Sequence, residues 1–508
     1  MGSKSNRLLI RADANAHMGT GHIMRCLALA QVWMDSGGEA IFLTACQRED
    51  LNVRLIAEGA EVRSMAAAPG SDEDAEETRD TALRSGASWV VLDGYHFSGA
   101  FQECVRRECV RVLAIDDYGH AGHYAADLVL NQNLHAKEEL YHDRKAYTRL
   151  LLGTRFAMLR REFRRWRGWK RDVPTVAHKV LVTLGGSDPF GVTRKVIEAL
   201  GLVGLPGLEA EVVVGGGHSH SGELEALAKR AGAAVRLGSN VTNMPELMAW
   251  ADVAVAAGGT TTWERAMLSL PGLVIVLADN QQDLATASEQ VGIGWNLGSH
   301  QSLTASALAA ALRRLLVDAP ARARMAHQGP EHCDGLGADR VLERMRGGVL
   351  HLRPVHGEDC RLIWEFANEP VTRSASFSPA PIPWEQHQSW FAAKLNDPCC
   401  DFFIAFDAQK QPVGQVRLDI DGAEAAISVS LATRFHGLGY GPEVIRLAVL
   451  HLFNSRTVER VNAFIRTENN RSYSAHFKAG FSEQGITSVR GQSARHLVLS
   501  RGRPEDPR

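Results

Sequence analysis

Short apolar runs alternate with amphipathic stretches along the first third of the chain. Residues 7–12 predict a strand, and residues 22–36 predict a helix that ends at Gly37 and Gly38. Further short apolar runs occur at residues 41–44, 89–92, 110–115 and 128–130. Short buried strands separated by helices are typical of a parallel sheet that carries helices on its faces.

The second segment of the chain repeats this pattern. Residues 179–184 predict a strand, Gly185 and Gly186 predict a turn, and residues 192–200 predict a helix. Further candidate strands occur at residues 211–214, 233–237, 253–256 and 274–276. We therefore expect two α/β domains of the same kind, at residues 1–168 and 175–346.

The order of the predicted elements changes in a third segment, which begins near Val349. A predicted strand at residues 349–352 is followed by helical stretches at 358–368 and 384–395. The remaining predicted elements are strands at residues 402–405, 413–419, 425–431 and 461–465, with helices from residue 441 and from about residue 472. Several strands in succession indicate a mixed sheet, so we expect residues 349–503 to form a separate domain.

Composition and charge narrow the range of partners. The chain has 508 residues, of which 45% are hydrophobic and 22% charged, as in globular proteins. Its 56 Lys and Arg residues and 58 Asp and Glu residues give a net charge of -2, which disfavours bulk electrostatic binding to nucleic acid. Residues 161–171 interleave basic and aromatic side chains; we interpret this segment as an interdomain linker and expect no nucleic-acid partner.

Cysteine spacing and hydropathy indicate the compartment. The eight cysteines contain no C-x-x-C pair, which fits a reducing cytoplasm. No apolar run approaches the length of a membrane span, and no signal-peptide stretch precedes Arg11. We therefore expect a soluble cytoplasmic protein with no membrane partner. The sequence leaves its oligomeric state open.

A glycine-rich tract at residues 215–220 contains the pair His218 and His220. A His-x-His pair is a common element of metal sites, but no further ligands lie nearby in the sequence. We interpret the tract as a flexible loop after a strand, and we expect no metal.

Two glycine-rich turns carry the candidate chemistry of the first two segments. Gly19 and Gly21 lie between the first predicted strand and its helix, where they allow a ligand to approach the backbone closely. His22 follows in the first turn of the helix, whose dipole favours a neutral imidazole that can accept a proton. A structural histidine that caps the loop is the alternative interpretation.

The second turn, at residues 257–264, follows a predicted strand in the second segment. Gly258, Gly259 and Thr260 offer backbone N–H groups at a helix start, and Glu264 could accept hydrogen bonds from sugar hydroxyls. Thr261 and Glu264 also have the spacing of a capping box, and both interpretations can hold together.

These motifs resemble those of the inverting nucleotide-sugar enzymes with two facing Rossmann-like halves, the GT-B-like fold. The closer resemblance is to the nucleotide-sugar hydrolases of pseudaminic acid biosynthesis, over about residues 7–300. The motifs that carry it are Arg11-Ala12-Asp13, Gly19-Thr20-Gly21-His22 with Arg25, Asp93-Gly94-Tyr95, Ile115-Asp116-Asp117, Asn131-Gln132-Asn133, residues 159–163, residues 185–188 and residues 258–264.

The resemblance implies hydrolysis of a UDP-linked 2,4-diacetamido-2,4,6-trideoxy sugar with inversion and without a metal. It implies that His22 is the general base and that Asp13 orients it or helps to hold the substrate. The implied substrate-binding residues are Gly19, Gly21, Arg25 and Tyr95, with Gly258, Gly259 and Thr260 at the diphosphate and Glu264 at the ribose.

The third segment carries two motifs of its own. Residues 434–441 form an R-x-x-G-x-G turn between a predicted strand and helix, whose N–H groups can wrap a pyrophosphate. Residues 469–481 form an asparagine-headed helix that ends in Gly480-Phe481. In this order they resemble the GNAT superfamily of acyl-CoA N-acetyltransferases. Residues 352–354, 358–359 and 368–370, with Arg373, His387 and Trp390, further resemble its members that act on nucleotide-linked amino sugars.

This second resemblance implies that acetyl-CoA is a co-substrate and that a UDP-linked amino sugar is the acceptor. The implied acetyl-CoA contacts are Arg434, Gly437, Leu438, Gly439, Gly441 and Asn469. The implied acceptor contacts are Asn368, Arg373 and His387. Many family members use a tyrosine acid on the second helix, whereas His476 stands at that position here. Either His476 or Tyr473 can be the acid, and a buried structural histidine is the alternative.

Together the two resemblances predict a bifunctional enzyme that acetylates the 4-amino group of a UDP-sugar and then removes UDP. One alternative is a glycosyltransferase that moves the sugar to an acceptor. The other is a non-enzymatic nucleotide-sugar sensor with a degenerate acetyltransferase. Release of free sugar without an acceptor, and turnover of acetyl-CoA, distinguish these alternatives.

Overall fold

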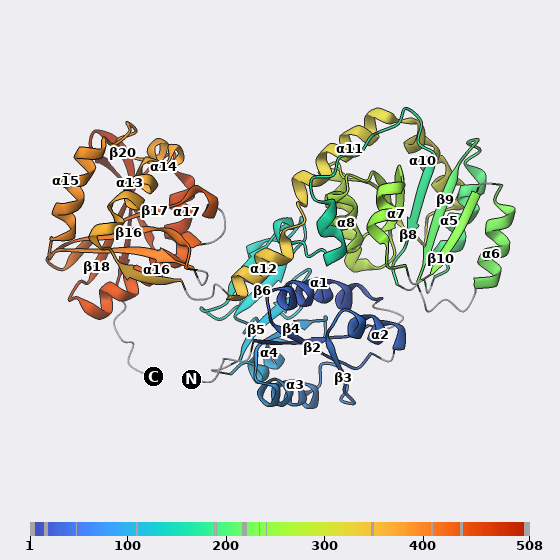
Figure 1. The fold of residues 1–508 in the computed structure, drawn as a ribbon, viewed down its shortest axis with the longest axis horizontal. Helices are drawn as coiled ribbons and strands as arrows, with labels where there is room; N and C mark the ends of the chain where they lie inside the picture. Colours follow the sequence, from blue (N-terminus) through green and yellow to red (C-terminus); the bar gives the residue numbers. More distant parts are fainter. Residues whose placement is uncertain are drawn as a thin grey trace. The chain divides into compact units, whose positions relative to one another are not determined.

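The computed structural model describes residues 6–14, 19–46, 48–107, 110–186, 188, 190–215, 221–232, 234–239, 241–346, 350–407, 410–436 and 440–501. The chain divides into two compact units, Met1–Met345 and Arg346–Arg508, which we call the first and second units (Figure 1). The first unit contains two parallel sheets, and we call the part around each sheet a half.

The first half is built on a parallel sheet with strand order β3-β2-β1-β4-β5-β6-β7. Its strands are β1 (Arg7–Ala12), β2 (Glu39–Thr44), β3 (Glu61–Ser64), β4 (Ala87–Asp93), β5 (Arg111–Ile115), β6 (Leu128–Asn131) and β7 (Arg149–Leu152). Its helices are α1 (Gly21–Asp35), α2 (Glu49–Ala57), α3 (Asp72–Ser85) and α4 (Gly99–Val105), with 3-10 turns η1 (Glu138–Tyr141), η2 (Thr154–Phe156) and η3 (Arg161–Trp166). Helices α1 and α2 cover one apolar face of the sheet, and α3 and α4 cover the other.

The second half repeats this plan with strand order β10-β9-β8-β11-β12-β13, again parallel. Its strands are β8 (Lys179–Thr183), β9 (Glu209–Val214), β10 (Ala234–Ser239), β11 (Val253–Ala257), β12 (Gly272–Val276) and β13 (Trp295–Ser299). Its helices are α5 (Val192–Leu202), α6 (Ser221–Arg230), α7 (Met244–Trp250), α8 (Thr261–Met267), α9 (Gln282–Gln290), α10 (Ala305–Val317) and α11 (Ala319–His332), with η4 (Asp279–Gln281). The predicted pair of Rossmann-like α/β halves is confirmed.

The last helix of the first unit returns to the first half. Helix α12 (Gly337–Arg346) buries Ala338, Val341 and Met345 in the same apolar core as α1, and Trp89 Nε1 donates to the Met345 carbonyl at 3.1 Å. This corrects the expectation that the second half runs continuously to residue 346. The amphipathic pattern of α12 predicts a helix, but it does not say which sheet the helix covers.

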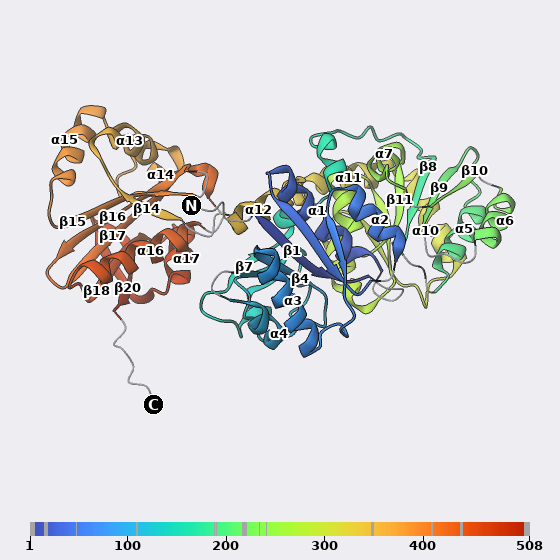
Figure 2. The same ribbon diagram turned by 60° about the horizontal axis from the view of Figure 1, so that its bottom comes forward.

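The second unit contains a mixed sheet with strand order β14-β15-β16-β17-β18-β20-β19. Its strands are β14 (His351–Pro354), β15 (Cys400–Phe406), β16 (Pro412–Asp421), β17 (Glu424–Leu431), β18 (Arg460–Arg466), β19 (Ser482–Val489) and β20 (Gln492–Ser500). Its helices are α13 (Cys360–Asn368), α14 (Pro370–Ala375), α15 (Trp384–Leu395), α16 (Tyr440–Ser455) and α17 (Asn470–Lys478), with η5 (Gly357–Asp359) and η6 (Thr433–Phe435). Helices α13 and α15 lie on one face of the sheet, and α16 and α17 lie on the other (Figure 2).

Strands β17 and β18 are the parallel pair of this otherwise antiparallel sheet. Both strands are fully described, and they pair with each other only through residues 424–426 and 460–462. Beyond that point the two strands diverge. The 3-10 turn η6 and helix α16 follow β17 at the end where the strands have separated. The mixed sheet confirms the predicted change of architecture near residue 349.

Candidate active site

A cleft of about 940 Å³ lies between the two halves of the first unit, at the carboxyl ends of their strands. This edge of a parallel sheet is where α/β proteins usually bind ligands. The predicted residues that line it are Gly19, Gly21, His22, Arg25, Tyr95, Gly258, Gly259, Thr260 and Glu264. The structure therefore brings the two glycine-rich turns, far apart in sequence, to one site.

The two halves meet closely at the glycine turns. A Cβ placed on Gly186 would lie 2.4 Å from the side chain of Thr20, so only glycine fits there without movement. Arg48 Nη1 donates to the Gly186 carbonyl at 3.1 Å. The turn after β8 thus contacts the start of α1, and Thr20, Arg48 and Gly186 all line the cleft.

His22 lies in the first turn of α1, and its side chain is buried against the end of β4. Nδ1 of His22 lies 2.5 Å from Oδ1 of Asp93, the last residue of β4. The Tyr95 ring packs edge-to-face on the imidazole at 5.0 Å between centroids. Nε2 of His22 makes no hydrogen bond with any described residue.

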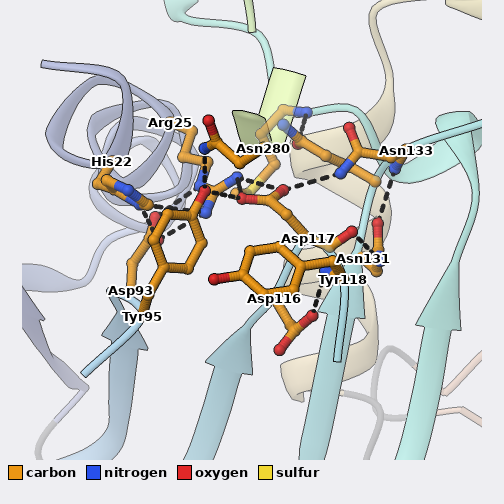
Figure 3. A network of polar contacts seen from close by, with 12 residues as sticks. His22, Arg25, Asp93, Tyr95, Asp116, Asp117, Tyr118, Asn131, Asn133 and Asn280 are labelled. Carbon is orange, nitrogen blue, oxygen red and sulfur yellow. Dashed lines mark hydrogen bonds and ion pairs between the residues drawn. The ribbon is translucent and has the colours of Figure 1, made fainter. Parts of the chain in front are cut away.

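Arg25, one turn further along α1, lies between two carboxylates (Figure 3). It donates from Nε and Nη2 to both oxygens of Asp93 at 2.7 Å, and from Nη1 to Asp117 at 2.8 and 3.0 Å. Tyr95 donates its hydroxyl hydrogen to Asp117 at 2.9 Å, and Asn280 of the second half donates to the Tyr95 oxygen at 2.8 Å. A continuous polar network therefore extends from His22 across the cleft.

The opposite charges in this network stabilise each other's ionised forms. Burial raises the pKa of Asp93, but the opposing influence of Arg25 and His22 is larger and holds that pKa well below its ordinary value. Burial lowers the pKa of Arg25, but Asp117 and Asp93 outweigh it and raise that pKa well above its usual range. Burial and Asp117 together raise the pKa of Tyr95. Both carboxylates are thus ionised, and Tyr95 keeps its proton.

Asp13, which was expected to orient His22, contacts a different group. It accepts hydrogen bonds from Ala45 N at 2.7 Å and Thr44 Oγ1 at 3.1 Å, and it pairs with Arg11 at 2.7 Å. It is absent from the described residues that line the cleft. Asp13 directly follows β1 and its side chain turns to the end of β2, whereas His22 reaches β4 on the other side of β1. The carboxylate beside His22 is Asp93.

A second buried carboxylate supports the loop after β5. Asp116 accepts from the backbone N–H groups of Tyr118 and Gly119 at 2.7 and 2.6 Å and from the hydroxyls of Tyr124 and Tyr141. These contacts shape the turn that presents its neighbour Asp117 to Arg25. The sequence analysis gave no roles to Asp93, Asp117 or Asn280, although Asp93 ends the buried strand β4 and Asp117 lies two residues after the buried strand β5.

Glu264 lies early in α8, as predicted, and its carboxylate is already engaged. Arg160 donates from Nη2 to Glu264 Oε1 at 2.7 Å and lies 2.9 Å from Glu162 through Nη1. Glu162 in turn accepts from Arg54 of α2 at 3.1 Å. Charged groups of both halves are thus linked on the cleft wall, where all four of these residues lie.

The arginines of the basic and aromatic segment at residues 161–171 make ion pairs and hydrogen bonds within the first unit. Arg164 pairs with Asp35 at 2.7 Å, and Arg167 pairs with Asp339 at 2.8 Å. Arg171 donates to backbone carbonyls of the second half, among them that of Ser269 at 2.9 Å. These contacts fit the linker interpretation, because the guanidinium groups that would meet a phosphate backbone are engaged within the chain.

The described part of the chain contains no group of three or more His, Cys, Asp or Glu side chains that could hold a metal ion. The predicted flexible loop with His218 and His220 lies outside the described residues. Among the described helices, none is both long and apolar enough to cross a bilayer.

In the second unit, part of the predicted acetyl-CoA turn is described. Arg434 is exposed, with its guanidinium 4.9 Å from the Phe435 ring. A Cβ on Gly441 would lie 3.3 Å from that of Ala475, so Gly441 allows α16 and α17 to pack closely. Asn469 caps α17 by accepting from Ser472 N at 3.1 Å. Gly437, Leu438 and Gly439 lie outside the described residues.

The predicted acceptor residues hold the backbone of the loops around α14. Asn368 exchanges hydrogen bonds with the backbone of Ile382 at 2.7 and 3.1 Å. Arg373 donates to the Ser378 carbonyl at 3.0 Å, and the buried His387 lies 2.9 Å from the Cys360 carbonyl. These contacts order the segment between α14 and α15.

Both candidate acids of the second unit hold their proton in a hydrogen bond within the protein. His476 is buried, and Nδ1 bonds to the Ser472 carbonyl at 2.9 Å, so that Nδ1 carries the proton and Nε2 is left without a described partner. Burial lowers the pKa of His476, which favours the neutral ring. Tyr473 donates to Glu483 at 3.0 Å, and that hydrogen bond raises its pKa. The buried-structural interpretation of His476 gains support from this geometry.

A smaller cavity of about 310 Å³ lies between α14, the end of β18 and the start of α17. Ser374, Arg466, Glu468, Asn469 and Arg471 contribute to its wall. Asn469 is the predicted residue of the second unit found there. The cavity lies near the end of β18, where that strand has left β17.

Comparisons with known proteins support two parts of the chain separately. Residues 350–482 match the family described as the acetyltransferase (GNAT) domain, and residues 180–337 match the glycosyltransferase family 28 C-terminal domain. MJ1062, an uncharacterized protein of Methanocaldococcus jannaschii, is 23% identical over 411 residues, which cover 77% of this chain and 78% of that protein. SpsG of Bacillus subtilis, a spore coat polysaccharide biosynthesis protein, is 28% identical over 165 residues, 32% of this chain and under half (48%) of SpsG.

Two solved structures align with part of the chain at low identity. The acetyltransferase AAC(6')-Ib, solved with ribostamycin and coenzyme A, is 20% identical and covers 30% of this chain and 93% of its own, with a TM-score of 0.28. Spermidine N-acetyltransferase of Vibrio cholerae, solved with CoA and spermine, is 22% identical and covers 30% and 95%, with a TM-score of 0.28. By its family matches, the chain joins a GNAT acetyltransferase domain to a glycosyltransferase-like part.

Proposed function

We propose that the first unit hydrolyses a UDP-linked 2,4-diacetamido-2,4,6-trideoxy sugar with inversion, and that the second unit acetylates the 4-amino group of its precursor. The observation that carries the hydrolase proposal is the position of His22. It lines the cleft that holds both glycine turns, and its Nε2 is the ring nitrogen without a described partner. The similarity of part of the chain to SpsG, a polysaccharide biosynthesis protein, also supports an activated sugar as substrate.

In the proposed hydrolysis, Nε2 of His22 takes a proton from water as the water oxygen bonds to the anomeric carbon. The bond from that carbon to the diphosphate oxygen breaks, and its electron pair leaves with UDP. Attack from the face opposite the leaving group inverts the anomeric centre. Chemistry of this kind needs a base on one side of the sugar and donors for the diphosphate on the other.

The turn at Gly258, Gly259 and Thr260 is the proposed diphosphate site. It lines the same cleft as His22. A Cβ on Gly259 would meet no protein atom within 4 Å, so that side of the turn is open to a ligand. Backbone N–H groups presented by such a turn suit an anion. Glu264, held by Arg160, is the proposed contact to the ribose hydroxyls.

In the proposed acetyl transfer, the 4-amine of the UDP-sugar attacks the thioester carbonyl of acetyl-CoA. A C–N bond forms, the C–S bond breaks, the amine loses a proton and the CoA thiolate gains one. The match to the GNAT domain supports this half of the proposal, and so does the divergence of β17 from β18 just before the predicted pyrophosphate turn. Acetylation precedes hydrolysis, because the hydrolase substrate already carries both acetamido groups.

One experiment tests both reactions. The full chain is mixed with the UDP-4-amino sugar and acetyl-CoA, and the mixture is followed by ¹H and ³¹P NMR. We expect a new N-acetyl signal, then free UDP and a free reducing sugar whose first-formed anomer is inverted. UDP-sugar that is acetylated but stable for hours in this assay would contradict the hydrolase half.

A glycosyltransferase is the second candidate, because residues 180–337 match a glycosyltransferase C-terminal domain. The same NMR experiment separates the two. A hydrolase releases free sugar in buffer, whereas a transferase leaves the UDP-sugar intact until an acceptor is added.

A further inference from the structure

The hydrogen bonds around His22 have only one consistent set of donors. Arginine has N–H groups and no acceptor, so both oxygens of Asp93 accept from Arg25. Oδ1 of Asp93 also lies 2.5 Å from Nδ1 of His22. Two lone pairs at that distance would repel, so Nδ1 carries a hydrogen that it donates to Asp93.

Nδ1 of His22 also makes a second, longer contact, with the guanidinium of Arg25. Nη2 of Arg25 lies 3.2 Å from Nδ1 of His22, which would suit an unprotonated Nδ1 that accepts from arginine. The same Nη2 lies 2.7 Å from Asp93 Oδ1, a shorter and charge-assisted bond. One Nη2 hydrogen and the Nδ1 hydrogen therefore both point to Oδ1 of Asp93, and the 3.2 Å contact is a consequence of their shared acceptor.

The charges of the cluster are unbalanced until His22 gains a proton. Asp93 and Asp117 are ionised, Arg25 is a cation, and His22 with one ring hydrogen is neutral, so the group carries one net negative charge. Asp93 is fully buried and His22 nearly so, where an uncompensated charge is costly. A proton taken up at Nε2 brings the cluster to zero net charge.

We propose that Asp93 is the positioning residue of the hydrolase: it holds His22 with hydrogen on Nδ1 and the lone pair on Nε2, and it compensates the imidazolium formed when His22 takes a proton from water. Arg25 and Asp117 act one step further away, by fixing the Asp93 carboxylate in place and in its ionised form. The inference rests on the proposed function for the identity of the base.

Asp93→Asn tests the proposal in the full-length chain, with Asp74→Asn as the matched control. Asp74 is also a fully buried carboxylate of the first half, paired with Arg11 at 2.8 and 2.9 Å, and it makes no contact with His22. We expect Asp93→Asn to lower kcat for UDP release by about 10²-fold or more with KM within about threefold, because the loss falls on the reacting base. Asp74→Asn should keep kcat within about threefold. Equal losses in the two variants would overturn a specific role for Asp93.

The ring tautomer is a readout that a merely structural role of Asp93 would not move. Histidine labelled with ¹⁵N in the ring is incorporated into the full chain, and His22→Gln identifies the His22 signals. At a pH where the ring is neutral, we expect hydrogen on Nδ1 in the unmodified enzyme and a shift of hydrogen toward Nε2 in Asp93→Asn. Hydrogen on Nε2 in the unmodified enzyme would overturn the proposal, even if Asp93→Asn failed to fold.

The two proposals fail in different ways. If the unmodified enzyme released no UDP but His22 carried its hydrogen on Nδ1 in a manner that depended on Asp93, the reaction assigned above would be wrong and the positioning role would stand. If UDP were released at full rate by Asp93→Asn, the hydrolase would stand and the role of Asp93 would be wrong.

Discussion

Nη2 of Arg160 donates a 2.7 Å hydrogen bond to Oε1 of Glu264, and so an arginine that follows the first sheet holds a carboxylate of the second half. Burial lowers the pKa of Arg160, but Glu264 and Glu162 outweigh it and the pKa is raised. One oxygen of Glu264 is therefore fixed by the protein, and the orientation of the other is set before a ligand arrives. Such preorganisation lowers the entropic cost of binding.

Arg160→Met should therefore weaken UDP binding without unfolding the protein. Glu264 would lose its hydrogen bond to Arg160, and its carboxylate would become free to rotate away from the proposed ribose site. We expect about a tenfold rise in the dissociation constant for UDP, equivalent to about 1.4 kcal/mol. Calorimetric titration with UDP measures it. Arg164→Met, which removes a partly exposed arginine paired with Asp35, is the control and should bind UDP normally. If the unmodified protein, Arg160→Met and Arg164→Met all bound UDP with the same affinity, Arg160 would have no role in the nucleotide site.

His22→Gln should abolish most of the hydrolysis and leave acetyl transfer untouched. Glutamine retains polar atoms near Asp93 but cannot take up the proton of the attacking water. We expect UDP release to fall by about 10²-fold or more, since general-base catalysis contributes that much. A UDP-release assay on pre-acetylated UDP-sugar measures this change, and UDP titration checks binding. Near-normal turnover by this variant would exclude His22 as the base.

Asp116→Asn should destabilise the first unit in a pH-dependent way. Burial raises the pKa of Asp116, but His120, with Nδ1 at 2.6 Å, and the hydroxyl of Tyr124 lower it to about 2, against an ordinary 3.8. A depressed carboxylate pKa contributes stability above its unfolded value, and that contribution is lost as pH falls toward the folded value. The shift corresponds to about 2 kcal/mol near neutral pH.

The measurement is the thermal midpoint of the unmodified protein and of Asp116→Asn across a pH series. We expect the variant to unfold at a lower temperature near neutral pH, with the gap narrowing below about pH 4 as the unmodified protein loses its ionised-carboxylate contribution. A gap that stays constant down to pH 3 would show that the substitution acts through packing and that the charge of Asp116 contributes nothing.

Residues 346–508 should fold and bind acetyl-CoA alone. This unit has its own sheet, and among the described residues its apolar cores are built from this unit alone. A compact unit with its own core is expected to fold independently. Circular dichroism and calorimetry with acetyl-CoA on the isolated fragment test this expectation. A fragment that is unfolded, or folded but unable to bind acetyl-CoA, would contradict it.

Alternation of apolar runs predicted the strands that are buried on both faces. β1, β4 and β11 have burial on nearly every residue, and each was found near its predicted position. β3 was missed because its sequence, Glu-Val-Arg-Ser, is polar and lies at the sheet edge. β19 was also missed, because it too is an edge strand with exposed side chains.

The resemblance to two-halved nucleotide-sugar enzymes also predicted that the two glycine-rich turns, which belong to different sheets, share one cleft. It did not predict which carboxylate contacts His22. Asp93 ends β4 and Asp13 directly follows β1, and Asp93 pairs in register with Ala12, one residue before Asp13. To choose between Asp13 and Asp93, one must know in which direction the His22 side chain points from α1. That direction depends on how the helix packs on the sheet and cannot be read from the local sequence pattern. Asn280 was not predictable at all, since its contact with Tyr95 exists only once the two halves are assembled.

Helix α12 completes the apolar core of the first half, although it follows the whole second half in the sequence. During synthesis, the core of the first half can therefore be completed only after the second half has been made. Trp89 and the apolar residues around it leave the ribosome long before their partners Val341 and Met345. At roughly 5–20 residues per second, the first sheet waits on the order of ten seconds or more while the whole second half is made. Throughout that interval the part of the apolar core that α12 later covers, around Trp89, lacks its last helix, although α1 and α2 have already been made. In biosynthetic terms, the second half is an insertion within the first.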